Sequence, residues 1–285
     1  MNDRVTVDIQ DGVADVRLVR IDKMNALDNA MFEALIQTGE RLKREPGLRA
    51  VVLSGEGRAF CAGLDMGNFQ AMASGERSGG EGTAGALVTT NRTEGGSNRA
   101  QHAVMVWREI PVPVIAAIHG VAFGGGFQLT LGADLRFVTS DVKLSVLEIK
   151  WGLIPDMAGM VLLRNLVRDD VARDLTFSGR IFSGDEALAM GLATRVCEHP
   201  LAEALAFARD VAAKSPHAIR AGKRLLNLIG DADQQAILLE ESREQTELMG
   251  KPNQVEAVRA GLEKRAPNFA EAEVDTSAPA PFGAG

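Results

Sequence analysis

Apolar and polar positions alternate over short distances in the first half of the chain. The stretches Val5–Ile9 and Val13–Arg20 are rich in apolar residues and are separated by Asp11-Gly12, a pair typical of a tight turn. This arrangement predicts a β-hairpin. Ala50–Leu53 is a short continuous apolar run, the pattern of a strand that is buried on both faces.

A helix pattern lies between the hairpin and this buried strand. Its apolar residues recur at helical spacing: Leu27, Met31, Leu35 and Leu42. Asn25 is a good N-cap type and Asp28 stands at the capping-box position, three residues later. The sequence therefore predicts a helix that Asn25 caps and that ends at about Arg44, just before Pro46-Gly47.

A run of glycines marks the middle of the chain. The apolar run Val112–Ile118 predicts a buried strand, and the triplet Gly124–Gly126 then leads into a helical pattern. Glycines at such a turn let a ligand approach free backbone amides, which favour negative charge; close packing of the backbone is the alternative explanation. The run is neither G-x-G-x-x-G nor a phosphate-binding loop. Leu135–Val138 and Lys143–Val146 resume the strand pattern, which predicts an α/β domain over residues 1–200.

The last third of the chain has a helical pattern from about Leu201 onwards. Ser215-Pro216 predicts a helix start, and Gly230 and Gly250 predict helix ends. The apolar faces of residues 201–269 need cover from the core or from another subunit. Residues 270–285, which are rich in Ala, Pro and Gly, are expected to be a disordered tail.

Residues 74–100 form a second polar, glycine-rich stretch, which predicts a flexible loop. A loop of this length inside a compact domain is either a mobile lid over a site or a tolerated insertion. The lid is the favoured interpretation, because the loop lies between two candidate site elements.

Composition narrows the class of protein. The chain has 285 residues, 46% of them hydrophobic and 24% charged, as in a soluble globular protein. It shows no apolar run long enough to span a membrane and no signal-peptide pattern. Two cysteines suit a reducing cytoplasm and give no metal-binding spacing. A net charge of −7 without a basic block argues against nucleic-acid binding.

Five motifs carry a resemblance to a known family. They stand in the family's order and spacing, and they are Arg20–Leu27, Ala59–Asp65, Ile118–Gly126, Gly152–Pro155 and Glu263–Phe269. On these motifs the chain resembles the crotonase superfamily, the enoyl-CoA hydratase/isomerase family. Residues 74–100 and the tail fall outside the resemblance.

The resemblance implies an α/β fold, a spiral of ββα units followed by C-terminal helices that assemble homotrimers or hexamers. It implies an acyl-CoA substrate, with coenzyme A as part of the substrate, no further cofactor and no metal. The thioester oxygen would lie between the backbone amides of Leu64 and Gly125, which stabilise negative charge on it. Contacts to coenzyme A are implied for Lys23, Asn25, Ala62, Asp65 and Lys264.

The proton-transferring residues depart from those of a typical hydratase of this family, which places one glutamate two residues after the glycine triplet and a second one twenty residues later. Here the first position is Gln128 and the second is Glu148. An amide transfers no proton near neutral pH, although Gln128 is able to orient a water molecule. Glu148 follows an apolar stretch, which would raise its pKa as a general acid or base requires. Asp156 is either a second proton-transferring group or the cap of a helix that begins near Met157.

These residues favour isomerisation of an enoyl- or dienoyl-CoA, with Glu148, Asp156 and Gln128 as the catalytic side chains. Hydration of 2-enoyl-CoA in fatty-acid β-oxidation is the alternative. Hydrolysis of an acyl-CoA thioester and a catalytically weak acyl-CoA-binding scaffold are further alternatives.

Overall fold

The computed structural model describes residues 3–68, 92–230 and 232–273. A six-stranded sheet has the order β1-β2-β3-β4-β6-β8, with β1 antiparallel and the other strands parallel to one another. Its strands are β1 (Val5–Gln10), β2 (Val13–Leu18), β3 (Ala50–Gly55), β4 (Val114–Ile118), β6 (Leu135–Val138) and β8 (Arg195–Val196). A second, parallel pair consists of β5 (Val121–Phe123) and β7 (Lys143–Ser145). The predicted hairpin and the predicted buried strands are confirmed.

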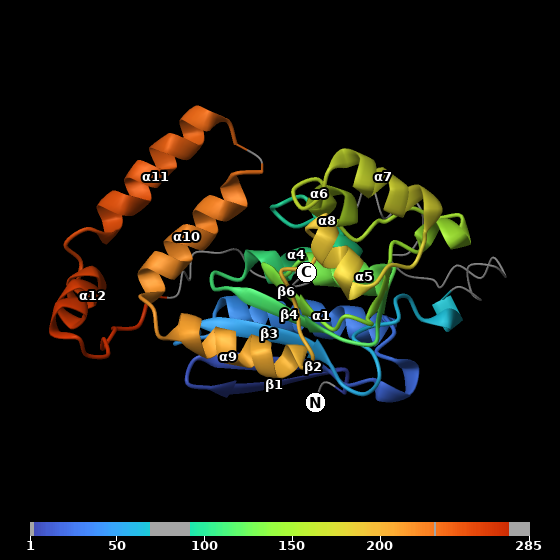
Figure 1. Cartoon of the computed structure of the whole chain (residues 1–285), viewed down its shortest axis with the longest axis horizontal. Coiled ribbons are helices and arrows are strands. Elements are labelled where there is room, and N and C mark those ends of the chain that lie inside the picture. Colours follow the sequence, from blue (N-terminus) through green and yellow to red (C-terminus); the bar gives the residue numbers. More distant parts are fainter. Residues whose placement is uncertain (1–2, 69–91, 231, 274–285) are drawn as a thin grey trace.

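Helices cover both faces of the large sheet (Figure 1). In chain order the helices include α1 (Asn29–Lys43), α4 (Arg99–Glu109), α5 (Gly125–Leu131), α6 (Gly159–Leu163), α7 (Asp169–Ser178), α8 (Gly184–Met190), α9 (Pro200–Ala212), α10 (Pro216–Leu228), α11 (Gln234–Leu248) and α12 (Pro252–Glu263), of which the last three do not cover the sheet. The chain also forms two short 3₁₀ helices, η1 (Ile21–Lys23) and η2 (Glu148–Trp151).

The core is divided by the sheet because side chains alternate along each strand. On β3, Val51 and Leu53 pack in the large cluster beneath α1 and α4. Ala50 and Val52 belong to the smaller cluster that α9 covers. Thus α9 is part of the core, although the sequence placed the whole segment after residue 200 in a separate helical region.

Helices α10, α11 and α12 extend away from the core as an arm on the left of Figure 1. The predicted start of α10 at Ser215-Pro216 is confirmed, with Pro216 as its first residue. Among the described residues, no helix is both long enough and apolar enough to cross a membrane.

Three local predictions are wrong. Helix α1 is capped by Asp28, whose side chain accepts a hydrogen bond from the Met31 N–H, and not by Asn25. The end of the predicted flexible loop is ordered, since α4 begins at Arg99 with a capping box made by Asn98. Residues 270–273 are held by Asn253 and Arg49 and are not a disordered tail. Residues 69–91, and with them most of the predicted lid, lie outside the described residues, as do 274–285.

Candidate active site

Two neighbouring segments present the backbone amides of Leu64 and Gly125. The segment around Leu64 pairs with Leu27, which donates its N–H to the Gly63 carbonyl (2.8 Å) and accepts from the Asp65 N–H (3.1 Å). The Gly63 carbonyl points toward Leu27. The N–H of Leu64 belongs to the same peptide group and therefore points away from Leu27. Gly125 is the first residue of α5, where a helix has no internal acceptor for the N–H. Neither amide donates to another residue within the described parts of the chain.

Glycine at position 63 brings these two segments together. It has a φ of +91°, a conformation that favours glycine. A Cβ atom there would lie 2.5 Å from the Phe123 carbonyl oxygen and 3.8 Å from the Gly125 nitrogen. Any side chain at position 63 would therefore separate the strand that ends at Phe123 from the Leu64 turn. The close approach at Gly63 therefore keeps the segment around Leu64 next to the start of α5.

Gln128 lies on α5, and only 1% of its surface is exposed. Its Oε1 accepts hydrogen bonds from the backbone N–H groups of Met157 (2.9 Å) and Gly159 (3.0 Å). These bonds fix the orientation of the carboxamide, so that Nε2 donates to Oε1 of Glu148 at 2.6 Å. Gln128 therefore contacts the Glu148 carboxylate directly.

Glu148 stands at the start of η2, beside the glycine triplet. A Cβ atom at Gly124 would lie 3.3 Å from Oε1 of Glu148, so the triplet leaves room for this side chain. Oε2 of Glu148 is buried and has no hydrogen-bond partner among the residues described. Burial raises the pKa of Glu148, and the negative charge of Asp156 raises it further, while hydrogen bonds from backbone amides and from Gln128 oppose the rise. A raised pKa suits a carboxylate that accepts and returns a proton.

Asp156 lies near Glu148 in an exposed turn. Solvent reaches the residue, yet the protein around the carboxylate desolvates it enough to raise its pKa. It does not cap a helix, because α6 begins at Gly159 with Ala158 in the N-cap position and no side-chain cap. Gln128 accepts the hydrogen bonds from Met157 and Gly159 that a local cap would take. What the structure shows of Asp156 is a carboxylate close enough for its charge to raise the pKa of Glu148.

The residues predicted to contact coenzyme A separate into two groups. Asn25 is fully buried, and its Nδ2 donates to the carbonyl oxygens of Glu56, Ala59 and Phe60 at 2.9–3.1 Å. The Asp65 carboxylate accepts from Arg20 (2.6 Å) and from the Gly67 N–H (2.8 Å). These two side chains hold the loops around Leu64, and the buried Asn25 is inaccessible to a ligand.

Of the other three predicted contacts, Lys23 and Ala62 lie near each other and Lys264 lies apart. Lys23 is exposed at the end of η1, and Ala62 is partly exposed with its N–H bonded to the Met24 carbonyl. Lys264 ends α12 on the arm and lies far from α5 and α6 (Figure 1). One chain alone does not bring Lys264 to the other site residues.

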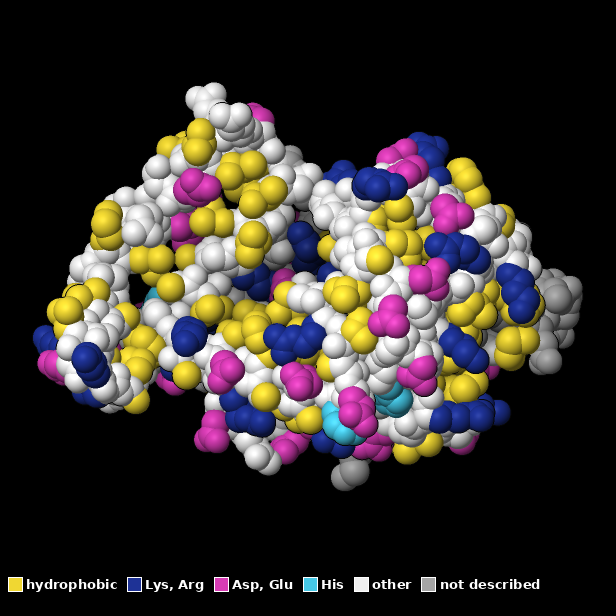
Figure 2. Space-filling view, viewed as in Figure 1, with side chains coloured by type: hydrophobic (Ala, Val, Ile, Leu, Met, Phe, Trp, Pro, Cys, Tyr) yellow, Lys and Arg dark blue, Asp and Glu magenta, His cyan; other side chains and the backbone are white. Residues whose placement is uncertain are grey.

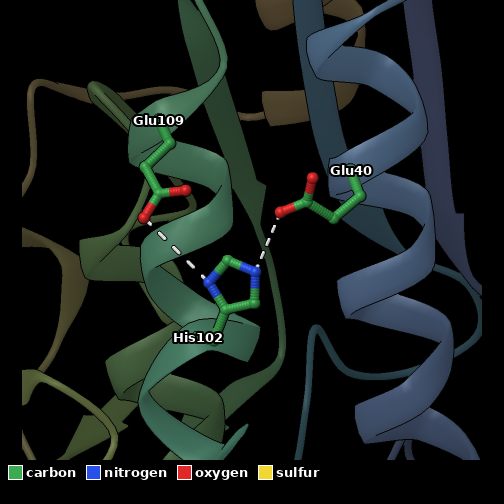
Figure 3. A group of neighbouring side chains, drawn as sticks. All are labelled: Glu40, His102 and Glu109. Atoms are coloured by element: carbon green, nitrogen blue, oxygen red, sulfur yellow. Dashed lines mark hydrogen bonds and ion pairs between the residues drawn. The ribbon is translucent and has the colours of Figure 1, made fainter. Parts of the chain in front are cut away.

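A separate polar cluster lies between α1 and α4 (Figure 3). Glu40, His102 and Glu109 could each offer a ligand atom to a metal ion. However, Nζ of Lys43 lies 2.9 Å from Glu40 and 2.6 Å from Glu109, so an ammonium group already balances both carboxylates. The His102 hydrogen bond, assisted by Lys43, lowers the pKa of Glu40 to about 2. A metal ion would have to displace Lys43, and we assign this cluster to the stability of the α1–α4 pair.

Comparison with known proteins decides the family. The model of the enoyl-CoA hydratase/isomerase family matches residues 8–272. The chain belongs to this family. The predicted resemblance to the crotonase superfamily is confirmed. The chain is an enzyme of the lyase or isomerase class that acts on an acyl-CoA thioester.

Relatives in the family carry different names. The chain is 32% identical over 228 residues to the mitochondrial Delta(3,5)-Delta(2,4)-dienoyl-CoA isomerase of Mus musculus, covering 79% of this chain and 68% of that protein. It is 31% identical over 248 residues to a probable enoyl-CoA hydratase of Bacillus subtilis, covering 86% of this chain and 90% of that protein. A crystal structure of an enoyl-CoA hydratase from a Polaromonas species has a TM-score of 0.82 at 26% identity, over 93% of this chain and 99% of that one. This structural match confirms the predicted fold class.

Proposed function

We propose that this family member isomerises a carbon–carbon double bond of an enoyl- or dienoyl-CoA, with Glu148 as the base. The observation that carries the proposal is the fixed carboxamide of Gln128. Its oxygen is bonded to two backbone amides and its nitrogen to Glu148 at 2.6 Å. A hydratase of this family needs two side chains that hold and activate a water molecule. Here the side chains at those two positions, Gln128 and Glu148, are hydrogen-bonded to each other.

The proposed reaction needs only proton transfer. Oε2 of Glu148 removes a proton from the carbon next to the thioester carbonyl, and the electron pair moves onto the carbonyl oxygen. The N–H groups of Leu64 and Gly125 stabilise the resulting enolate. Return of a proton at the far end of the conjugated system leaves the double bond shifted, with no atom gained or lost. The chemistry uses no metal and no cofactor beyond the coenzyme A of the substrate.

Asp156 supports the dienoyl form of this reaction. In an enoyl-CoA the two carbons that exchange the proton are close enough for one carboxylate to serve both. In a dienoyl-CoA the second carbon is farther along the chain, and a second proton-transferring group is needed there. Asp156 has a raised pKa and lies close enough to raise that of Glu148. A relative at 32% identity bears the name of a dienoyl-CoA isomerase.

A panel of thioesters tests the proposal. Purified enzyme is offered 3-enoyl-CoA, 3,5-dienoyl-CoA and 2-enoyl-CoA, and the products are separated by mass and by chromatography. We expect products of unchanged mass from the first two substrates and little water addition to the third. Rapid water addition to 2-enoyl-CoA would favour the hydratase, release of free coenzyme A the hydrolase, and binding without turnover the scaffold; each result would overturn the proposal.

Exchange of Gln128 for glutamate tests the role of the carboxamide. In Gln128→Glu the new carboxylate lies against Oε1 of Glu148, and two ionised groups at that distance repel, so that one of them keeps a proton. We expect the ratio of hydration to isomerisation to rise roughly tenfold, because a second acid–base group becomes available. Gln128→Met is the matched control, since it keeps the length and adds no carboxylate. An unchanged ratio in Gln128→Glu would contradict the assignment.

We further propose that the arm assembles the enzyme into trimers or hexamers. Helices α11 and α12 and their connection expose large apolar side chains: Leu238, Leu239, Met249, Val255, Val258 and Leu262. Exposed apolar surface of this extent is typical of an interface. Light scattering on a sizing column is expected to give three or six times the chain mass of 30.4 kDa, and a monomer would contradict this proposal.

A further inference from the structure

A large hollow separates the arm from the core. Its volume is about 780 Å³, within the range of small-molecule sites. The ends of α1 and α4 form one wall, and α10, α11 and the first turn of α12 form the other. Figure 2 shows the opening between the arm and the core, with lysine and arginine side chains inside it. None of the candidate active-site residues lines this hollow.

Arg220 of α10 is a buried charge on the wall of the hollow. Only 8% of the residue is exposed, and its guanidinium makes two long hydrogen bonds, to the carbonyl oxygens of Glu273 (3.4 Å) and Leu48 (3.5 Å). Its Nε has no acceptor in the described part of the chain. A buried guanidinium that bonds only to neutral carbonyls is costly, and an anion would compensate its charge.

The other arginines near Arg220 are paired with carboxylates. Arg49 is paired with Glu271 at 2.9 Å, and Arg224 is paired with Glu244. Burial lowers the pKa of Arg220, and the positive charges of Arg49 and Arg224 lower it further, against the opposing effect of Glu271. Arg49 and Arg224 thus each have a carboxylate partner, whereas the guanidinium of Arg220 is hydrogen-bonded only to backbone carbonyl oxygens.

Two helix N-termini meet at the same place. Ser215 and Lys251, the N-caps of α10 and α12, make no side-chain cap hydrogen bond, and the first turns of both helices line the hollow. Asn253 of α12 donates its Nδ2 to Nδ1 of His217 of α10 at 2.8 Å and joins the two turns. The first-turn amides of a helix carry partial positive charge and bind anions.

The Asn253 bond also orients His217. Paired bonds with the backbone of Ala270 fix the Asn253 carboxamide, so its nitrogen is the donor toward Nδ1. This assigns the proton of neutral His217 to Nε2. The residue is exposed, and its Nε2–H is a further donor at the junction of the two helices.

Two lysines that line the hollow are already paired with carboxylates. Lys43 is held by Glu40 and Glu109 at the α1–α4 end, and Lys223 is held by Asp134. Two more acids, Glu247 and Glu273, also line the hollow, and the Glu273 backbone carbonyl accepts a hydrogen bond from Arg220. Cationic groups thus line both ends of the hollow, and the first-turn amides of two helices are found where α10 meets α12.

We propose that this hollow binds a small phosphate-bearing molecule, with the phosphate at the junction of the α10 and α12 N-termini beside Arg220 and His217. Several N–H donors that come from different elements suit a tetrahedral group with several charged oxygens. The hollow has room for an organic portion next to the phosphate. The site is separate from the acyl-CoA chemistry and does not depend on the function proposed above.

Calorimetric titration with inorganic pyrophosphate tests the site, with citrate as a carboxylate of comparable charge. We expect pyrophosphate to bind more tightly than citrate and to raise the melting temperature. Arg220→Gln should weaken pyrophosphate binding at least about tenfold, and His217→Ala roughly fivefold, through the loss of hydrogen bonds to a charged group. Arg209→Gln is the matched control, since it removes an exposed arginine of α9 outside the hollow and should leave binding unchanged.

The outcomes separate clearly. Glu148→Gln should retain pyrophosphate binding, whereas loss of binding in that variant would place the anion at the active site and overturn the proposal. Equal binding of citrate would overturn the choice of phosphate. No binding to the wild type, or wild-type binding in both Arg220→Gln and His217→Ala, would overturn the site itself. If Arg220→Gln does not fold, the exposed His217→Ala variant alone decides.

Discussion

Glu148→Gln is expected to lower kcat for double-bond isomerisation about a thousandfold, because a positioned acid–base group typically contributes 10²- to 10⁴-fold. The replacement keeps the size of the side chain, and its carbonyl oxygen is still able to accept the bond from Gln128. The N–H groups proposed to hold the thioester are backbone groups and stay in place. We therefore expect KM to change little. Initial rates with 3-enoyl- and 3,5-dienoyl-CoA measure both constants.

The pH profile provides the control for this variant. Burial raises the pKa of Glu148 above its ordinary value of 4.5, so the acidic fall of kcat/KM should lie above that pH. The base is active when ionised, and activity is lost as the pH falls through the raised pKa. The Gln128 hydrogen bond favours the ionised form, so Gln128→Met should move the fall to higher pH. A Glu148→Gln enzyme with unchanged melting temperature and nearly wild-type kcat would show that another group moves the proton.

Local patterns predicted the strands and the glycine turn because these depend on neighbours in the sequence. The continuous apolar runs at β3 and β4 reflect burial on both faces of the sheet. The glycines at 124–126 lie against Glu148, Met157 and Cys61, and such crowding favours glycine, which is its signal in the sequence. The turn alone did not single out the amide of Gly125, which was implied by the family resemblance.

The roles of polar side chains were harder to predict because their partners are distant in the sequence. Asn25 is a good N-cap type, but it has a φ of +56° and bonds to carbonyl groups more than thirty residues away. Gln128 accepts from Met157 and Gly159, and this removed the need for Asp156 to cap α6. No local pattern contains such pairings. The hollow beside Arg220 is likewise formed by segments that only the fold brings together.

The second large effect is expected from Gly125→Pro, which removes one of the two proposed oxyanion donors. Gly125 is the first residue of α5, a position where proline fits a helix well because its N–H has no internal acceptor. The substitution deletes the N–H that would bond to the enolate oxygen. Loss of one such donor typically costs about a hundredfold to a thousandfold in kcat. Isomerisation rates at saturating substrate measure the loss.

Gly125→Ala is the matched control for the added atoms. A Cβ atom at this position would lie 2.7 Å from Sδ of Met157 and 2.9 Å from Cδ1 of Leu27, the ends of side chains that are able to shift. Alanine introduces this crowding and keeps the N–H, so its kcat should fall far less than that of the proline variant. Equal losses in the two variants would mean that crowding, and not the missing donor, causes the effect. Both variants keep the Leu64 N–H. The residual kcat of Gly125→Pro therefore measures the rate that is reached when a single N–H donor stabilises the enolate.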